Sequence, residues 1–469
     1  MRKVLLVLLV ASAAGAAVPD GVRDFVALDA HTIALTHVRV IDGTGAPARA
    51  DQTLVIEDGR IRAVGDAATT AVPAGAQVLD LTGKSVFPGL VGMHDHLFMT
   101  AIREQPIFLN QVSLSSTRLY LASGVTSIRT TGSLEPYADL NIKRLIDEGK
   151  MPGPKVHVTG PYLEGAGTQF PQMHELKDAD SARRMVEFWA DQGSTSFKAY
   201  MHITRAELRA AIAAAHKRGI KVTGHLCSIG YREAAELGID NLEHGFFVAS
   251  DFVADKKPDL CPDGVTAALG ALDPDGPAAR GLIKLLVARK VAITSTLPVF
   301  EAILPRRAVP QRVLSLLAPE AAVSALATKA RLAASGLPPG FADAFEKDKV
   351  LERAFVRAGG VLLAGSDPTG IGTVLAGLAD QREVELLVEA GFTPVEALHI
   401  ATENGARFLG EDKKIGTVAA GKQADLVIVR GDPSTQIDDI ENVEMVFKDG
   451  VGYDPAKLLD SVRGRVAIE

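Results

Sequence analysis

The feature that most constrains the fold is an alternation of short strand-like runs with helical stretches through the middle of the chain. Eight runs rich in apolar and β-branched residues occur there, separated by segments with helical character. Such alternation predicts parallel strands joined by helical crossovers, and eight units over roughly 300 residues fit a (β/α)8 barrel of the TIM type. The runs span residues 89–94, 124–130, 155–160, 194–200, 221–225, 240–244, 291–297 and 361–367.

An open, doubly wound α/β sheet is the alternative arrangement of the same elements. Sheets of that kind more often carry a glycine-rich phosphate-binding loop after the first strand. No such loop follows "GLVGMH" at residues 89–94. The barrel is therefore the preferred prediction within the α/β class.

The clearest helix follows the fourth run. Thr204 and Glu207 have the spacing of a capping box, and Gly219 stands where the helix should end. An apolar stripe at helical spacing lies between them. Its members are Leu208, Ala211, Ile212 and Ala215.

The interval from residue 297 to 360 is long for a barrel connection. Two segments within it, 319–336 and 341–360, have helical character. We expect one of them to be the barrel helix and the other to lie over the mouth of the barrel. Additions at this end are where substrate choice would reside.

Both ends of the chain have the pattern of short antiparallel strands. Residues 31–45 and 53–65 alternate apolar and polar residues, and Asp58-Gly59 is a strong hairpin signal. Residues 416–433 and 443–450 have the same character. We expect strands from both termini to form one small sheet domain.

The charge pattern argues against a nucleic-acid partner. The net charge is −7, and acidic and basic residues are mixed along the chain. Proteins that bind nucleic acids usually carry a basic balance or a basic patch. The composition instead fits a globular protein with a solvated surface of mixed charge.

The first residues resemble an export signal, which we place at residues 1–17. Arg2 and Lys3 precede an apolar run, and small residues follow at Ala14 and Ala16. The apolar run is too short to anchor the chain in a bilayer. We expect an exported protein without a membrane anchor after cleavage, periplasmic if the source is a Gram-negative bacterium.

Only two cysteines occur, Cys227 and Cys261. In an oxidising compartment they could form one disulfide, and two separately buried thiols are the alternative. Two cysteines are too few for a cysteine-rich zinc site.

Metal-binding residue types stand at the ends of the predicted strands. In a parallel barrel these ends meet at one face, and the His-x-His of the first strand directs both imidazoles to the same side. Imidazole and carboxylate groups suit zinc, and also manganese, iron, cobalt or nickel. The residues are His94 and His96 on the first strand, Lys198 on the fourth, His225 on the fifth, His244 on the sixth and Asp367 on the eighth.

Six candidate ligands exceed what one tetrahedral zinc needs, so the set indicates two divalent metal ions. Lys198 is the exception among them, because an ammonium would be repelled by two cations. Either the lysine reacts with CO2 to give a carbamate whose two oxygens bridge the metals, or it lies off the site and pairs with a carboxylate.

The motifs "GLVGMHDH", "FKAY", "TGHL", "LEHG" and "AGSDP", and the closing "GKQADLVIV", resemble the amidohydrolase superfamily, in particular its imidazolonepropionase-related and prolidase-like branch. The resemblance covers nearly the whole chain after the signal. It implies a barrel over residues 87–409 and a discontinuous β-sandwich built from residues 30–86 and 410–455.

The resemblance also implies roles for the strand-end residues. His94 and His96 would bind the more buried metal, with zinc as the expected ion, and His225 and His244 the more exposed one. Lys198 would bridge the two metals as a carbamate. Asp367 and His244 are the expected catalytic residues: a metal-bridging hydroxide attacks the carbonyl, and Asp367 carries the proton to the leaving nitrogen.

The resemblance implies cleavage of an amide C–N bond in a dipeptide or an N-acyl amino acid. Two departures weaken a dipeptidase assignment. Relatives acting on dipeptides commonly carry a tyrosine where this chain has Cys227, and an Arg-Asp pair where it has Arg129-Thr130. Candidate substrate-binding residues, each of which could equally be a packing or surface residue, are Tyr200, His202, Tyr231, His174 and Arg129.

Other functions stay open at this point. The same site could hydrolyse cyclic amides, lactones, other esters or phosphotriesters. A catalytically dead binding protein would usually have lost a ligand, whereas the full set is present, and metal storage fits an enclosed site poorly. The expected partner is a small molecule or short peptide, and enzymes of this resemblance are often homo-oligomers.

Overall fold

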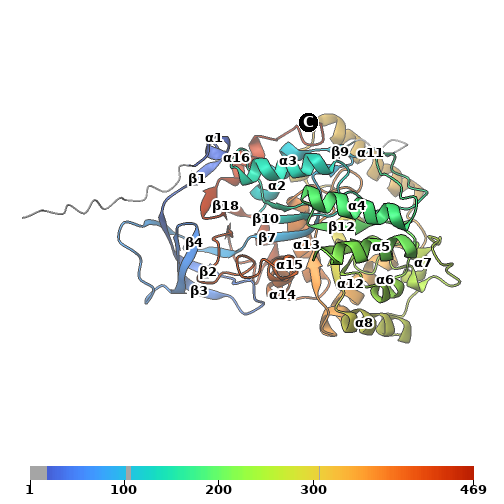
Figure 1. The fold of residues 1–469 in the computed structure, drawn as a ribbon. Coiled ribbons are helices and arrows are strands. Elements are labelled where there is room, and N and C mark those ends of the chain that lie inside the picture. Colours follow the sequence, from blue (N-terminus) through green and yellow to red (C-terminus); the bar gives the residue numbers. More distant parts are fainter. Residues whose placement is uncertain (1–17, 102–106, 306, 469) are drawn as a thin grey trace, which may run out of the picture.

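The computed structural model describes residues 18–101, 107–305 and 307–468. A sheet of antiparallel character lies on one side of the molecule and a larger part of parallel strands and helices on the other (Figure 1). The predicted export signal falls on residues 1–17, outside the described residues, and stays a prediction.

All eight predicted runs contain a strand. Each strand begins within its run. Strands of a parallel sheet are buried on both faces, so they stand in the sequence as short, nearly continuous apolar segments. The strands are β7 (Leu90–Asp95), β10 (Val125–Thr130), β11 (Lys155–His157), β12 (Ser196–Ala199), β13 (Lys221–Gly224), β14 (Asn241–Glu243), β15 (Ala292–Ser295) and β16 (Leu362–Ala364).

These strands pair in parallel in two sheets, β11-β10-β7 and β12-β13-β14-β15-β16. An isolated parallel bridge between Thr159 and Ser196 links the chain after β11 to β12. On the other side, the amides of Ser366 and Asp367 donate to the carbonyl of His94 at 3.2 and 2.8 Å. The arrangement is a TIM-barrel-like α/β fold, although the strand ladders themselves do not run round a closed barrel.

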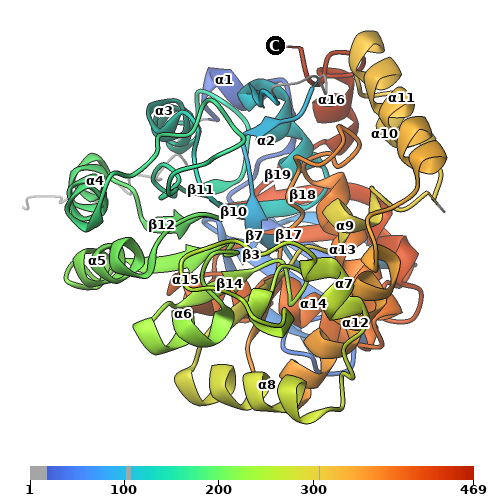
Figure 2. The same cartoon turned by 90° about the vertical axis from the view of Figure 1, so that its right-hand side faces the viewer.

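Helices lie outside the parallel strands (Figure 2). The expected capping box is confirmed, since the Thr204 side chain accepts from the amide of Glu207 and the helix buries the predicted stripe. The helices between successive strands are α2 (Ser113–Ala122), α3 (Pro136–Asp147), α4 (Ala179–Gln192), α5 (Arg205–His216), α6 (Tyr231–Leu237), α7 (Val265–Gly270), α8 (Pro277–Arg289), α9 (Leu297–Glu301), α10 (Gln311–Leu314), α11 (Pro319–Ser335) and α12 (Phe341–Arg357).

The two helices of the long interval have different environments. α12 buries Phe345, Leu351 and Phe355 and leads directly into β16, so it is the helix of that strand–helix unit. α11 buries fewer side chains, and its Lys329 donates to the carbonyls of Ala302 and Leu304, just after α9. α11 is therefore the added helix.

Strands from both chain ends form one nine-stranded sheet, as predicted. The hairpin turn lies at Asp58 and Gly59, both with positive φ (49° and 74°). The sheet order is β1-β19-β18-β17-β6-β2-β3-β4, with β5 paired to β2. A two-layered β-sandwich is not established by this pairing and stays a prediction. The strands are β1 (Val26–Leu28), β2 (Thr32–Val40), β3 (Arg49–Glu57), β4 (Arg60–Asp66), β5 (Gln77–Asp80), β6 (Lys84–Pro88), β17 (Leu426–Arg430), β18 (Val443–Lys448) and β19 (Val451–Tyr453).

The short elements complete the described chain. Of the helices in the described part, none is both long and apolar enough to cross a membrane. The remaining elements are α1 (Asp20–Arg23), β8 (Phe98–Met99), β9 (Asn110–Gln111), η1 (Ser250–Phe252), α13 (Leu378–Glu389), α14 (Pro394–His399), η2 (Ile400–Asn404), α15 (Gly405–Leu409), η3 (Ile437–Glu441) and α16 (Pro455–Asp460).

Cys227 and Cys261 form a disulfide, with their Cα atoms 4.8 Å apart. Of the two alternatives left by the sequence, the structure has the bonded pair. The bond ties the segment after β13 to the segment before α7.

Candidate metal centre

The two histidines of the His-x-His motif lie at the end of β7 and are both buried. His94 donates from Nδ1 to Glu243 Oε2 at 2.8 Å. With that nitrogen protonated, the lone pair of Nε2 is left for the site. Backbone alternation and the hydrogen bond to Glu243 together direct His94 Nε2 into the space where the other strand ends meet.

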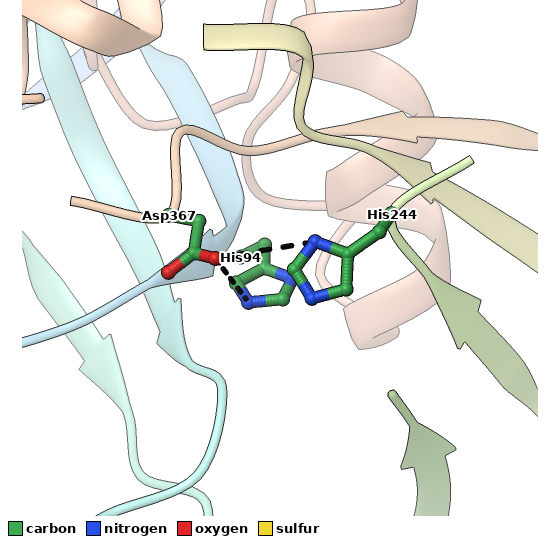
Figure 3. Close-up of side chains that lie close together, drawn as sticks. All are labelled: His94, His244 and Asp367. Atoms are coloured by element: carbon green, nitrogen blue, oxygen red, sulfur yellow. Dashed lines mark ion pairs between the residues drawn. The ribbon is translucent and has the colours of Figure 1, made fainter. Parts of the chain in front are cut away.

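Asp367 is the centre of this arrangement. Its Oδ1 lies 3.4 Å from His96 Nε2, and its Oδ2 lies 3.8 Å from His94 Nε2 and 3.9 Å from His244 Nδ1. Figure 3 shows the carboxylate directed between His94 and His244. Three strand ends far apart in sequence therefore converge on one point.

Lys198 and His225 complete the predicted set. Lys198 Nζ lies 3.0 Å from His94 Nε2. The ring of His225 lies 4.3 Å, between centroids, from the ring of His244. All six residues predicted from the strand ends thus come together.

Two of these residues have unusual backbone conformations. His244 has φ 70° and Asp367 has φ 47°, in the left-handed region that non-glycine residues seldom adopt. Tyr231 clamps the backbone at His244, because its hydroxyl lies 2.9 Å from the Glu243 carbonyl and 3.0 Å from the Gly245 carbonyl. Strain held by such neighbours is common at functional sites.

The histidines are in the state that binds metal. Burial lowers the pKa of His96 to about 4 and that of His225 to about 3, so both imidazoles are neutral at physiological pH. Burial alone would raise the pKa of Asp367, but the neighbouring imidazoles hold this pKa well below its usual range. Burial lowers the pKa of Lys198 to about 8.

The residues present fit a divalent metal. His96 Nδ1 and His244 Nε2 are buried and have no hydrogen-bond partner in the described part of the chain, an arrangement that costs free energy unless something binds there. His94, His244 and Asp367 offer ligand atoms that all lie within 4.8 Å of one another. Neutral imidazoles with a carboxylate are the donor set of zinc and related ions.

Glu243 is a site residue that the sequence analysis missed. It is fully buried, its Oε2 holds His94, and its Oε1 accepts from Arg129 Nη2 at 2.7 Å. Against the effect of burial, Arg129 and His94 hold the pKa of Glu243 at about 2. The signal was its place in "LEHG": an acid inside a buried strand needs partners.

Three of the candidate substrate-binding residues lie where they do not contact the cavity, so the prediction for them is corrected. Arg129 is buried below the site, where it pairs with Glu243 and donates from Nε to the Met93 carbonyl at 2.9 Å. Tyr231 is buried with its hydroxyl bonded to backbone, so it is not available to a substrate. His174 is exposed on a loop and does not line the cavity.

His202 also stays away from the cavity wall, with its Nδ1 3.5 Å from Glu164 Oε2. Tyr200 does reach the cavity, and its ring lies 4.9 Å from that of His225. Of the five candidates, Tyr200 alone is placed to contact a substrate.

A cavity of about 220 Å³ opens over the converging side chains. Five of the six predicted metal-site residues line it, His94 being the one that lies behind them. The other described lining residues come from the surrounding loops and short helices. The cavity is lined by His96, Phe98, Thr100, Ile107, Leu109, Tyr162, Gln169, Phe170, Met173, Lys198, Tyr200, His225, His244, Val299, Phe300, Asp367, Thr369 and Gly370.

Comparison with known proteins gives a consistent result. The model of the amidohydrolase family matches residues 85–452. A dihydroorotase of Trichlorobacter lovleyi is 32% identical over 135 residues, covering 28% of this chain and 30% of the relative. An imidazolonepropionase of Nocardia farcinica is 36% identical over 141 residues, covering 30% of this chain and 33% of the relative. The chain thus matches about a third of the length of these curated relatives.

Solved structures match over a longer range. A candidate prolidase from Bifidobacterium longum is 26% identical, with a TM-score of 0.64. The match covers 92% of this chain and 99% of that one. The similarity therefore includes both the parallel strands and the sheet built from the chain ends.

Proposed function

Because the chain belongs to the amidohydrolase family, we propose that it is a metal-dependent hydrolase that cleaves an amide C–N bond in a dipeptide or an N-acyl amino acid. The observation that carries the proposal is the convergence of His94, His244 and Asp367, with Lys198 beside them, under one cavity. Hydrolysis needs an activated water and a proton carrier at one point, and this arrangement offers both.

The family implies the use of divalent metal, and we propose two ions, with zinc as the expected metal. His94, His96, Lys198, His225, His244 and Asp367 are the residues that would hold them. When bound, the ions supply a hydroxide near neutral pH and polarise the substrate carbonyl.

Asp367 is the proton carrier in this proposal. Its Oδ2 faces His94 and His244 and its Oδ1 faces His96, so the group that would take the proton and pass it to the leaving nitrogen lies among the metal-site histidines. Thr369 donates to Oδ1 at 2.9 Å and fixes its direction. The Asp367 carboxylate is ionised at neutral pH, the state in which it can accept a proton. Tyr200 could then donate a hydrogen bond to the substrate in place of the phenol that Cys227 replaces.

We propose that Lys198 carries a carbamate. A neutral amine is needed to react with CO2, and burial favours the neutral form of this lysine. The alternative, a lysine paired with a carboxylate off the site, has less support: within the described residues Lys198 makes no ion pair, and its Nζ is directed at His94.

Glu243 should act as a positioning residue for the metal ligand His94. Glu243→Gln keeps the size of the side chain but removes the charge that fixes the tautomer of His94, and outer partners of this kind are worth about 10–100-fold in metal affinity. We expect a loss in that range by competition titration against a chelator. Asp139→Asn, a buried acid bonded to Ser133 and Gln111 away from the site, is the matched control. An unchanged metal affinity in Glu243→Gln would contradict the role of Glu243 in positioning His94.

We further propose that the eight parallel strands form a closed barrel over residues 87–409, and that residues 30–86 and 410–455 form a two-layered sandwich. The Thr159–Ser196 bridge and the amide bonds to the His94 carbonyl support closure on both open sides.

We propose that the protein is exported, to the periplasm in a Gram-negative source, and that it acts on a small molecule or short peptide as a homo-oligomer without nucleic acid. The support for export is the pattern of residues 1–17 and the disulfide, a bond typical of oxidising compartments.

A substrate screen tests the proposed reaction. The zinc-loaded mature protein is incubated with pooled dipeptides and N-acyl amino acids, and released amines are detected by mass spectrometry. We expect release from one chemically related set. If metal is bound and no pool releases amine, the amide proposal fails, and cyclic amides, lactones and other esters become the substrates to test.

A further inference from the structure

The cavity above the candidate metal centre has an apolar cluster of its own. We call it the mouth cluster: Phe98, Leu109, Tyr162, Met173 and Tyr200 are buried together, with Phe170 packed against them. This cluster is separate from the main core, and all six side chains line the cavity. Their packing therefore shapes the cavity wall.

Aromatic rings of the wall lie directly against the metal-site histidines. Phe98 stacks on His96 with centroids 4.3 Å apart, and Tyr200 lies 4.9 Å from His225. Phe300, which also lines the cavity, lies 5.7 Å from His244. A group next to the scissile bond would therefore be surrounded by aromatic surface.

The rings of the mouth cluster pack edge to face around Tyr200. Tyr162 and Phe170 lie 5.0 and 6.3 Å from Tyr200, at steep interplanar angles. An apolar cavity of about 150 Å³ accommodates benzene. A cavity of about 220 Å³ has room for a phenyl ring together with an amide.

The wall also offers hydrogen-bond donors to a substrate. The hydroxyls of Tyr162 and Tyr200, which have no hydrogen-bond partner among the described residues, suit neutral acceptors such as a second amide.

We infer that the preferred substrate is an amide of the proposed class with an aromatic or bulky apolar group beside the scissile bond. This inference rests on the proposed function and narrows its substrate class. Phe170, Met173 and Tyr162 are the residues that determine this specificity.

Two N-acyl amino acids test the inference: N-acetylphenylalanine and N-acetylalanine. We expect kcat/KM for the first to exceed that for the second by at least about tenfold, the usual effect of burying an aromatic side chain. Products are resolved by mass spectrometry.

Variants locate the preference in the wall. Phe170→Ala should bring the phenylalanine-to-alanine ratio close to one, mainly through a higher KM for the phenylalanine compound, and Phe170→Leu should restore part of the ratio. Phe188→Ala, which removes an exposed ring on α4 away from the cavity, is the matched control and should leave the ratio unchanged.

Equal turnover of the two compounds would overturn the inference and leave the proposed amide hydrolysis standing. If neither compound is hydrolysed by metal-loaded protein, the substrate screen decides the proposed function, and calorimetric binding of the same two compounds decides the inference separately. Tighter binding of N-acetylphenylalanine by about tenfold, lost in Phe170→Ala, supports the inference. Equal binding of the two compounds contradicts it.

Discussion

Replacing Asp367 by asparagine should leave most of the metal bound and lower kcat by about 10²–10⁴-fold, the range attributed to general acid–base groups. The amide keeps one oxygen for the metal centre but cannot accept and return a proton. Asparagine also tolerates the left-handed backbone that Asp367 adopts, so the variant tests chemistry with little added strain. The measurement is kcat with metal content by elemental analysis.

The matched control for this variant is Asp58→Asn. Asp58 has nearly the same backbone conformation, with φ 49°, but lies in the hairpin turn of the terminal sheet. It should retain full activity. Full activity in Asp367→Asn would exclude the proton-carrier role, whereas loss of metal together with activity would reassign Asp367 as a ligand alone.

Replacing Lys198 by alanine should remove metal and activity together. A bridging ligand is shared by both ions, so its loss should exceed the roughly 10–100-fold effect of an outer partner on metal affinity. Added acetate or propionate can occupy the space of the carbamate and offer two oxygens, so partial recovery of metal and activity is expected. Metal content and turnover are measured with and without the acids.

Lys448→Ala, which removes a partly buried lysine from β18 of the terminal sheet, is the control and should bind metal normally with or without added acids. Unaltered metal content in Lys198→Ala would reject Lys198 as a ligand. Loss of metal without any recovery in short acids would favour a lysine that acts without CO2.

The strand–helix alternation predicted more of this fold than any single motif. All eight parallel strands lie where short apolar runs were found, because a strand buried on both faces has a continuous apolar signature. Knowing that parallel strands share one orientation was then enough to bring His94, Lys198 and Asp367 together. The position of the site follows from the order and common direction of the parallel strands, and the hydrophobic periodicity of the sequence predicts both well.

The features that the sequence analysis missed depend on which residues meet in the folded chain, not on hydrophobic periodicity along the sequence. Glu243 and Arg129 are neighbours only in space, so although an acid in a buried strand indicates that a partner is needed, neither position identifies that partner. Tyr231 was interpreted as a possible phenol for the substrate, whereas its hydroxyl holds the backbone around His244. The mouth cluster was missed because Tyr162, Phe170 and Met173 stand in the connection between β11 and α4. Hydrophobic periodicity does not predict the path of such a connection.

The sheet built from both chain ends has a consequence for the order in which the protein can fold during synthesis. β6 pairs with β2 on one edge and with β17 on the other, and these partners come from opposite ends of the chain. Until Leu426 to Arg430 has emerged from the ribosome, β6 is an edge strand with unpaired backbone groups, which invites association with other chains. The first strands to be made are thus among the last to be completed, and a chain that stops short of β17 leaves that edge open.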